Sequence, residues 1–346
     1  MKMMRRLLLL LLIIVANVEM HAFSWSLDSI AEMGRFPNFC VRAYRWADWA
    51  FNHVDSNYVK PTGYKMNVKV RSQSWAEYNS FFFGLNERIG MRSKFTTSLG
   101  ADLTYLAVSV GYSINCNKIF DDTEKSAKRF NFDFTSARIS GRFYAVSNDG
   151  GMIITQVGKV KKQDIPFDDV KTSTWGLEGT YFFNHERYSN GAALSFSKLQ
   201  QRSQGSFTLG MAYQRQKLRF DFRALPEEVK MQLPEEEQNM VFASDGNIIG
   251  ISGGYGYNWV PLQRLTVGVS TSLIPSLHYG YLNDTQKDCS FRMNYRLNLS
   301  AVINNGRWFY GVVFRADAGN IFTGSTVLSN SVLTIEAKAG WRFNLW

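Results

Sequence analysis

The histidines are the first residues whose types and spacing could support catalysis. The chain has four of them, and three, His53, His185 and His278, lie beyond the first 22 residues. A lipase or protease needs a histidine beside a serine or an aspartate, because the histidine moves the proton of the attacking group. Ser276 lies two residues before His278, on the same face of an extended strand. A hydrolase using His278 is therefore an alternative function, against the simpler interpretation that His278 is an inward-facing polar residue.

Charged residues near the C-terminus form a second pattern. Three successive segments carry charges on one phase of an alternating sequence, at Arg292, Arg296, Arg315, Asp317, Glu336, Lys338 and Arg342. Neighbouring antiparallel strands would bring the opposite charges within reach of each other. Such a network braces and fills a narrow barrel, because charges away from water need partners. A ring of arginine and lysine side chains would instead select anionic solutes, and both interpretations stay open.

Other catalytic and metal-binding motifs are missing from the sequence. It contains no CxxC or Cys/His metal spacing, no phosphate-binding loop and no paired-carboxylate motif. We predict no catalytic, cofactor-binding or metal-binding residue and no cofactor, and we favour a protein that is not an enzyme. The odd set Cys40, Cys116 and Cys289 leaves at least one thiol without an intramolecular partner, and a disulfide between Cys116 and Cys289 stays open.

The elements that must position these residues are β-strands. From Tyr64 onward, apolar and polar residues alternate with a period of two. In residues 291–303, seven apolar residues occupy one face and five polar residues the other. A strand of this length can cross an outer membrane, which needs about 9–11 residues. A soluble β-rich periplasmic domain is the competing class, but its strands would be shorter, about 5–6 residues.

The connections between these segments differ in length. Short turn candidates lie at 105–106, 184–187 and 304–307, and longer polar stretches lie at 116–127, 157–172, 223–246, 281–288 and 318–328. The apolar phase flips after Phe134 and again after Tyr213, where either a bulge or a tight turn would explain it. These flips give 12 or 14 strands. We predict an all-β fold, a transmembrane antiparallel up-and-down β-barrel of about 12 strands (range 10–14).

The N-terminal residues predict export. Lys2, Arg5 and Arg6 precede an apolar run of about 10 residues, which is typical of a signal peptide and too short for a transmembrane helix. We expect residues 1–22 to be a cleaved signal peptide. Residues 23–56 follow as a periplasmic N-terminal helical segment, which Pro37 interrupts, or as an unstructured linker; as helices they could plug or cap the barrel. Residues 57–346 form the barrel.

Composition and charge suggest lipid partners. Without residues 1–22 the chain keeps 36 basic and 28 acidic side chains, a formal charge near +8. Export makes nucleic acid an unlikely target of this charge, so we expect no nucleic acid and name outer-membrane lipid and lipopolysaccharide as partners. The last strand, which ends on Trp346, should contact the barrel-assembly machinery. Aromatic residues at 15% and a mean hydropathy of −0.21 are typical of a membrane barrel. The apolar residues of its outer face and the polar residues of its inner face cancel in the mean hydropathy.

Several stretches resemble a family of uncharacterised Bacteroidetes outer-membrane β-barrels, domain of unknown function 4421. They run from Asn57 to Val68, from Leu99 to Tyr105, and from Tyr181 through Ser189 to Ser206. The resemblance covers about residues 55–346. It implies a barrel in an outer membrane, and it transfers no activity to any residue.

Together these observations predict an integral protein of the cell outer membrane. We expect either a narrow, non-enzymatic channel or a structural or surface protein, with the hydrolase built on His278 as the alternative. Ligand and oligomeric state do not follow from the sequence.

Overall fold

The computed structural model describes residues 27–84, 87–105, 108–117, 128–149, 151–283, 286–323 and 326–344. The chain divides into two units, with the boundary between Asn52 and His53. The expected signal peptide, residues 1–22, and the C-terminal Trp346 lie outside the described residues.

The N-terminal unit contains the helices α2 (Leu27–Glu32) and α3 (Arg35–Asn52). Gly34 separates them with a φ of +148°, a backbone angle that glycine adopts readily. Pro37 lies in the first turn of α3, where its missing N–H has no helical partner to lose, so it does not interrupt the segment. Arg45 pairs with Asp28 at 2.5 Å. None of the helices in the described part of the chain is both long and apolar enough to span a membrane.

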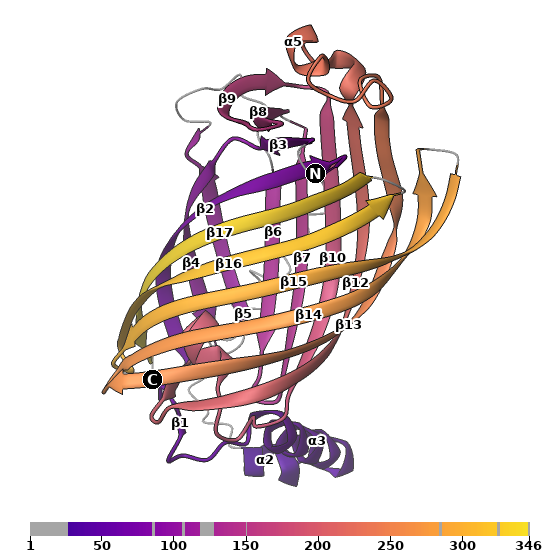
Figure 1. Cartoon of the computed structure of the whole chain (residues 1–346). Helices are drawn as coiled ribbons and strands as arrows, with labels where there is room; N and C mark the ends of the chain where they lie inside the picture. Colours follow the sequence, from indigo (N-terminus) through magenta and orange to yellow (C-terminus); the bar gives the residue numbers. More distant parts are fainter. Residues whose placement is uncertain are drawn as a thin grey trace, which may run out of the picture. The chain divides into compact units, whose positions relative to one another are not determined.

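The second unit is an antiparallel sheet that curls into a barrel (Figure 1). In the described residues, twelve strands follow one another around it in chain order. They are β2 (Met66–Phe82), β4 (Thr96–Tyr105), β5 (Val108–Asn115), β6 (Lys128–Thr135), β7 (Ile139–Asn148), β10 (Val170–Phe182), β12 (Gln204–Asp221), β13 (Val241–Leu262), β14 (Leu265–Leu282), β15 (Gln286–Asn304), β16 (Trp308–Thr323) and β17 (Thr326–Phe343). The prediction of an antiparallel up-and-down barrel of about 12 strands is confirmed.

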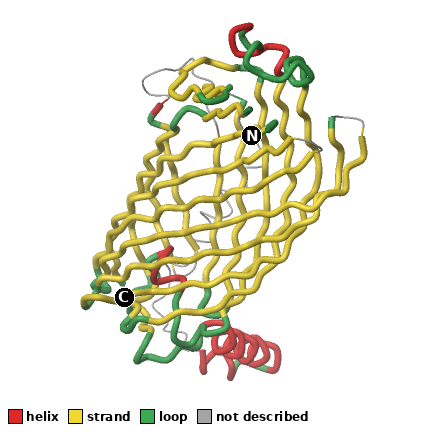
Figure 2. The backbone as a smooth tube through the Cα atoms, viewed as in Figure 1, coloured by secondary structure: helices red, strands yellow, loops and turns green. Residues whose placement is uncertain are grey.

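The pairing runs around the barrel with one open seam. β17 pairs with β2, from Val327 opposite Phe82 to Phe343 opposite Met66, which joins the two ends of the barrel sequence. Within the described residues no backbone pairing joins β5 to β6. Strand dominates this unit, and helix is confined to short turns (Figure 2).

The two ends of the barrel differ, although not at every connection. The long polar stretches expected at 281–288 and 318–328 are largely strand, because β14 and β15 are only three residues apart there and β16 and β17 only two. At the short-turn end, turns of two or three residues join β6 to β7, β13 to β14 and β15 to β16. At the opposite, long-loop end lie three more strands, β3 (Arg88–Arg92), β8 (Met152–Val157) and β9 (Val160–Phe167), which extend the sheet from β2. The 3₁₀ turn η3 (Phe222–Ala224) and the helix α5 (Glu227–Lys230) also lie there (Figure 1).

One connection at the short-turn end is long. Residues 184–187 form the expected turn, but the chain between β10 and β12 continues through the π-helical turn η2 (Gly191–Ser195) and the strand β11 (Lys198–Gln200). β11 pairs with β1 (Val59–Pro61). The expectation of a short hairpin here was wrong, because residues 188–200 fold back into the barrel as a plug segment.

The two changes of apolar phase have different causes. The first is a tight turn, from Thr135 at the end of β6 to Ile139 at the start of β7. The second is neither a bulge nor a turn, because β12 pairs with β10 and β13 without a register shift. On β12, Leu209 points outward, whereas Leu218 and Phe220 point inward. The inner face of the barrel itself becomes apolar towards the long-loop end.

Candidate functional site

The lumen of the barrel is the place where polar side chains gather, and ion pairs cross its middle. Arg296 on β15 donates from Nη1 and Nη2 to both carboxylate oxygens of Glu178 on β10, at 2.6 and 2.7 Å. Its Nε also donates to Asp317 on β16 at 2.6 Å. Arg142 reaches the same aspartate from β7, with 3.1 Å between Nη2 and Oδ2. One carboxylate therefore joins two guanidinium groups from different walls of the barrel.

Further pairs extend this ion-pair layer. Arg315 on β16 approaches Asp133 on β6 at 3.5 Å, and Lys338 pairs with Glu336 along β17 at 2.9 Å. Most of these charged side chains keep a small fraction of their surface exposed, for example 16% for Arg296 and 8% for Glu178. Charges so removed from water are tolerated because each has a charged partner. The layer fills and braces the middle of the lumen.

An apolar layer fills the lumen at the long-loop end. Phe81 on β2 packs edge-on against Phe220, Phe222 and Phe242, with ring centroids 5.0–5.3 Å apart. Side chains from the elements beyond the strand ends complete the cluster, among them Ile89, Met91, Ile154, Val157, Leu225, Val229 and Leu233. The segments over the barrel end thus pack by the same apolar burial that forms a protein core.

The plug segment occupies the short-turn end. Phe196 has a φ of +62° and is fully buried against Val302, Phe309 and Val313. Glycines on the barrel wall make room for the plug: a Cβ added to Gly268 on β14 would lie 2.7 Å from the Cβ of Ala193. This wall position therefore needs glycine because the side chain of Ala193 comes so close.

Polar side chains of the barrel hold the plug backbone. Arg342 on β17 donates to the carbonyl oxygen of Phe196 and, at 2.9 Å, to Oδ1 of Asn304. Lys338 donates to the carbonyl oxygen of Leu194 at 3.2 Å. Asn258 on β13 donates to the carbonyl oxygen of Ser189 at 2.9 Å. These bonds satisfy plug carbonyl groups that no strand pairs, so side chains of two strands, β13 and β17, hold the plug.

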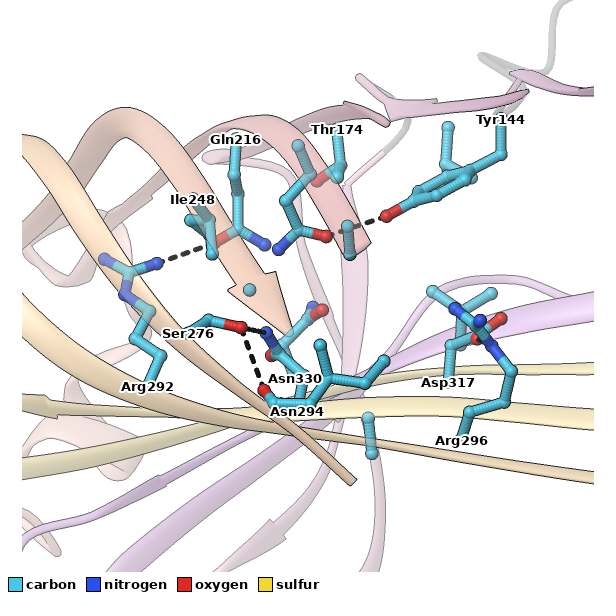
Figure 3. A pocket seen from close by; sticks show the side chains of 18 of the residues that line it. Tyr144, Thr174, Gln216, Ile248, Ser276, Arg292, Asn294, Arg296, Asp317 and Asn330 are labelled. Carbon is cyan, nitrogen blue, oxygen red and sulfur yellow. Dashed lines mark hydrogen bonds and ion pairs between the residues drawn. The ribbon is translucent and has the colours of Figure 1, made fainter. Parts of the chain in front are cut away.

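Between the ion-pair layer and the apolar layer lies a cavity of about 100 Å³ (Figure 3). Arg292 borders it and is almost fully buried, donating to Oε1 of Gln216 at 2.9 Å and to Ser244 at 3.0 Å. Glu77 borders it too, and accepts hydrogen bonds from Thr172 at 2.8 Å and Asn330 at 3.0 Å. A space of this volume holds only a few water molecules or a very small solute.

The family model for domain of unknown function DUF4421 matches residues 53–343. The chain belongs to the DUF4421 family. The match begins at the first residue of the barrel unit and ends with β17. The curated proteins contain no significant match to this DUF4421 chain.

Solved structures similar to the DUF4421 chain are outer-membrane β-barrels. The protease OmpT of Escherichia coli aligns over 80% of this chain and 96% of its own, at 9% identity and a TM-score of 0.38. The translocator domain of the autotransporter NalP from Neisseria meningitidis covers 89% and 96%, at 8% identity and a TM-score of 0.27. The toluene transporter TodX of P. putida covers 82% and 91%, at 8% identity and a TM-score of 0.22. No activity of these proteins transfers to this chain at such scores.

The seven charges singled out from the sequence lie on the inner faces of three neighbouring strands of the DUF4421 barrel. Arg296 and Asp317 stand directly opposite each other in the β15–β16 register and form an ion pair. The other five have different partners. Arg315 pairs with Asp133 on β6, and Glu336 pairs with Lys338. Arg292 borders the cavity, and Arg342 donates to the plug.

Sequence reasoning missed three members of the ion-pair layer. Asp133, Arg142 and Glu178 supply partners from β6, β7 and β10, and Glu77 adds a buried carboxylate from β2. Each lies on the inward phase of its strand, which was visible in the alternation. What the sequence did not show was which strands face each other across the lumen.

The geometry around His278 does not form a catalytic site. His278 is fully buried, and its Nδ1 lies 2.7 Å from Oδ2 of Asp288. Ser276 donates instead to the carbonyl oxygen of Ile274 at 2.8 Å. The remaining nitrogen, Nε2, is blocked by the wall at Gly246, where even a Cβ would clash with it. A substrate cannot reach either group in this arrangement. No group of three or more metal-ligating side chains occurs in the part of the chain that the structure describes.

All three cysteines are free thiols: Cys40 and Cys289 are exposed and Cys116 is half-buried.

Proposed function

We propose that this DUF4421 protein is an integral outer-membrane β-barrel with a structural or surface role, and that its lumen is closed to the free passage of solutes. The observation that carries the proposal is the filling of the lumen at three levels, by the apolar layer, the ion-pair layer and the plug segment. A passive channel needs a continuous water-filled path, and each level interrupts such a path with packed or paired side chains.

The outer surface supports a place in a membrane. Side chains that point away from the lumen are large, apolar and exposed on neighbouring strands. In one register row Leu177, Tyr213, Ile249, Leu277 and Phe291 follow one another across β10, β12, β13, β14 and β15. In water such a surface would be an aggregation site, whereas lipid chains would cover it.

The two ends suggest an orientation. β2 begins at the short-turn end and β17 ends there, as an even number of strands requires. Outer-membrane barrels keep short turns on the periplasmic side and longer loops outside the cell. We therefore place the apolar layer, α5 and β3, β8 and β9 at the cell surface.

A narrow channel is the runner-up, because buried arginines line the cavity. It is distinguished from a closed barrel by conductance. The folded protein in a planar bilayer should give no steady current steps. A variant in which glycine–serine linkers replace residues 189–199 and 223–239, and in which Glu178 and Arg296 become alanine, should give them.

Folding and insertion are checked separately, by the mobility difference between heated and unheated gel samples and by release only with detergent. Steady ohmic steps from the folded wild type would replace the closed barrel with the channel. A protein released without detergent would refute the membrane location.

A further inference from the structure

Basic residues form a band on the outer surface of the barrel. They take no part in the contacts that fill the lumen. The band follows one register row: Lys128 on β6, Ser147 on β7, Ser173 on β10, Lys217 on β12, Asp245 on β13, Tyr281 on β14 and Lys287 on β15. Each residue is paired with the next across a strand boundary. These side chains point outward, since their strand neighbours face the lumen.

The two adjoining rows add more basic residues. Lys171 pairs with Arg219 one row closer to the long loops, and Trp175 pairs with Arg215 one row further from them. We define the basic belt as Lys128, Lys171, Arg215, Lys217, Arg219 and Lys287. Among the strand-paired, described residues of these three rows, Asp245 is the one acidic residue, and it pairs with Arg215 and with Lys217. Asp221 lies on the same face of β12 as Arg219, one row closer to the long loops. Basic side chains outnumber acidic ones across the belt.

The belt borders the apolar surface directly. Going away from the long loops, the next row after that of Trp175 and Arg215 is Leu177, Tyr213, Ile249, Leu277 and Phe291. Neighbouring strands are about 4.8 Å apart and alternate residues about 6.6 Å apart, so several ammonium and guanidinium groups fall within reach of one headgroup. The charge thus lies where lipid chains end and headgroups begin.

The belt is confined to one wall. On β16, β17 and β2, the outward-facing positions in the described residues carry no charge at all, with Phe322, Tyr310, Ile335 and Val70 among the exposed side chains. A general requirement for solubility or for any membrane would place charges around the whole barrel. A one-sided belt indicates a specific contact on the β6–β15 wall.

We infer that the basic belt binds the phosphate groups of the glycolipid in the outer leaflet, the lipid A part of lipopolysaccharide. This inference rests on the proposed membrane location, with the long loops outside the cell. Phosphate groups carry the negative charge that lysine and arginine bind best in charge-assisted contacts. Beside the belt lie Trp175, Tyr279 and Tyr281, at the level where amphipathic aromatic rings favour the membrane interface.

The test measures lipid adducts of the folded, detergent-solubilised protein by native mass spectrometry. The probes are diphosphorylated lipid A, dephosphorylated lipid A and phosphatidylglycerol. The wild type should bind diphosphorylated lipid A more tightly than either other probe. Replacing Lys128, Lys171, Lys217 and Lys287 by glutamine should weaken that binding by about tenfold or more.

The matched control removes four charges at the short-turn end, by Lys60→Gln, Lys65→Gln, Arg202→Gln and Arg264→Gln, and should leave binding unchanged. All four control residues are exposed. Unchanged lipid A binding by the belt variant overturns the inference, as does equal binding of dephosphorylated lipid A or phosphatidylglycerol. Heat-dependent gel mobility reports the fold independently, so a failed barrel and a failed lipid site give different results.

Discussion

Glu178 shows what a single buried residue contributes to this barrel. Its carboxylate is 8% exposed and accepts both terminal nitrogens of Arg296, which also binds Asp317. A charged side chain on either wall needs the opposite charge on the other wall. Without that partner, its loss of hydrating water would not be compensated. The pair therefore ties β10 to β15 across the lumen.

We predict that Glu178→Gln lowers the free energy of unfolding by roughly 3–5 kcal/mol, the usual cost of breaking a buried ion pair on one side. Denaturant unfolding of the protein in detergent or lipid measures this value. Glu186→Gln, at an exposed turn position, is the control and should change it by less than about 0.5 kcal/mol. Equal effects of the two substitutions would show that the ion-pair layer does not hold the walls together.

His185 offers a test at the short-turn end. Burial and the neighbouring Arg138 lower the pKa of His185, and Arg138 donates to its Nε2 at 3.1–3.3 Å. The folded state therefore favours the neutral ring. Its stabilising contribution is present above the ordinary pKa of about 6.5 and is lost as the pH falls towards the lower folded pKa.

An NMR titration of His185 should give a pKa below about 6.5, and Arg138→Gln should raise it. A pKa of His185 at or above that of an unfolded peptide would contradict the assigned contact.

At the scale of elements, the plug segment depends on glycine in the strand it covers. Gly268 on β14 lies against Ala193, and Gly311 on β16 lies against Phe196. The neighbouring strand β15 comes at least as close, through Ser300 at Gly268 and through Ala301 and Val302 at Gly311. These glycines therefore make room for the plug and for β15 together.

Gly268→Val should expel the plug, because the added Cβ alone would already lie 2.7 Å from the Cβ of Ala193. Limited proteolysis should then cut at Lys198, which is half-buried in the wild type. Gly253→Val is the matched control, since nothing lies within 4 Å of a Cβ added to Gly253 on β13. Protection of Lys198 in the Gly268 variant would mean that the plug does not depend on this contact.

At the scale of the whole molecule, the direction in which a tryptophan points should decide whether its ring contacts lipid. Trp259 faces outward and is 54% exposed, whereas Trp75 is 3% exposed and lies under the guanidinium of Arg129. A soluble barrel would expose Trp259 to water, and a membrane barrel would expose it to lipid.

In vesicles containing bromine-labelled lipids, a variant that keeps only Trp259 should lose much of its fluorescence, and a variant that keeps only Trp75 should not. Both fluorescence intensities are compared with those in unlabelled vesicles. Equal quenching of the two residues, or none of either, would contradict a lipid-facing outer surface.

The sequence by itself determined the strands and their two faces. The period of two in residues 291–303 depends only on the geometry of an extended chain, so it indicated an inner polar face before any partner strand was known. Arg296 and Asp317 could be expected to meet because their strands follow each other in the chain.

Only the tertiary structure decided what fills the lumen. Arg142 and Glu178 meet partners from walls that lie far apart in sequence, and residues 188–200 fold inward instead of forming a hairpin turn. In the sequence, Phe220 appeared to break the alternation of its strand. It faces the lumen without a break in the strand, because the apolar layer makes the inner face apolar at that end, and several elements build that layer. These contacts depend on the curling of the sheet, which brings distant residues together by strand order and not by local pattern.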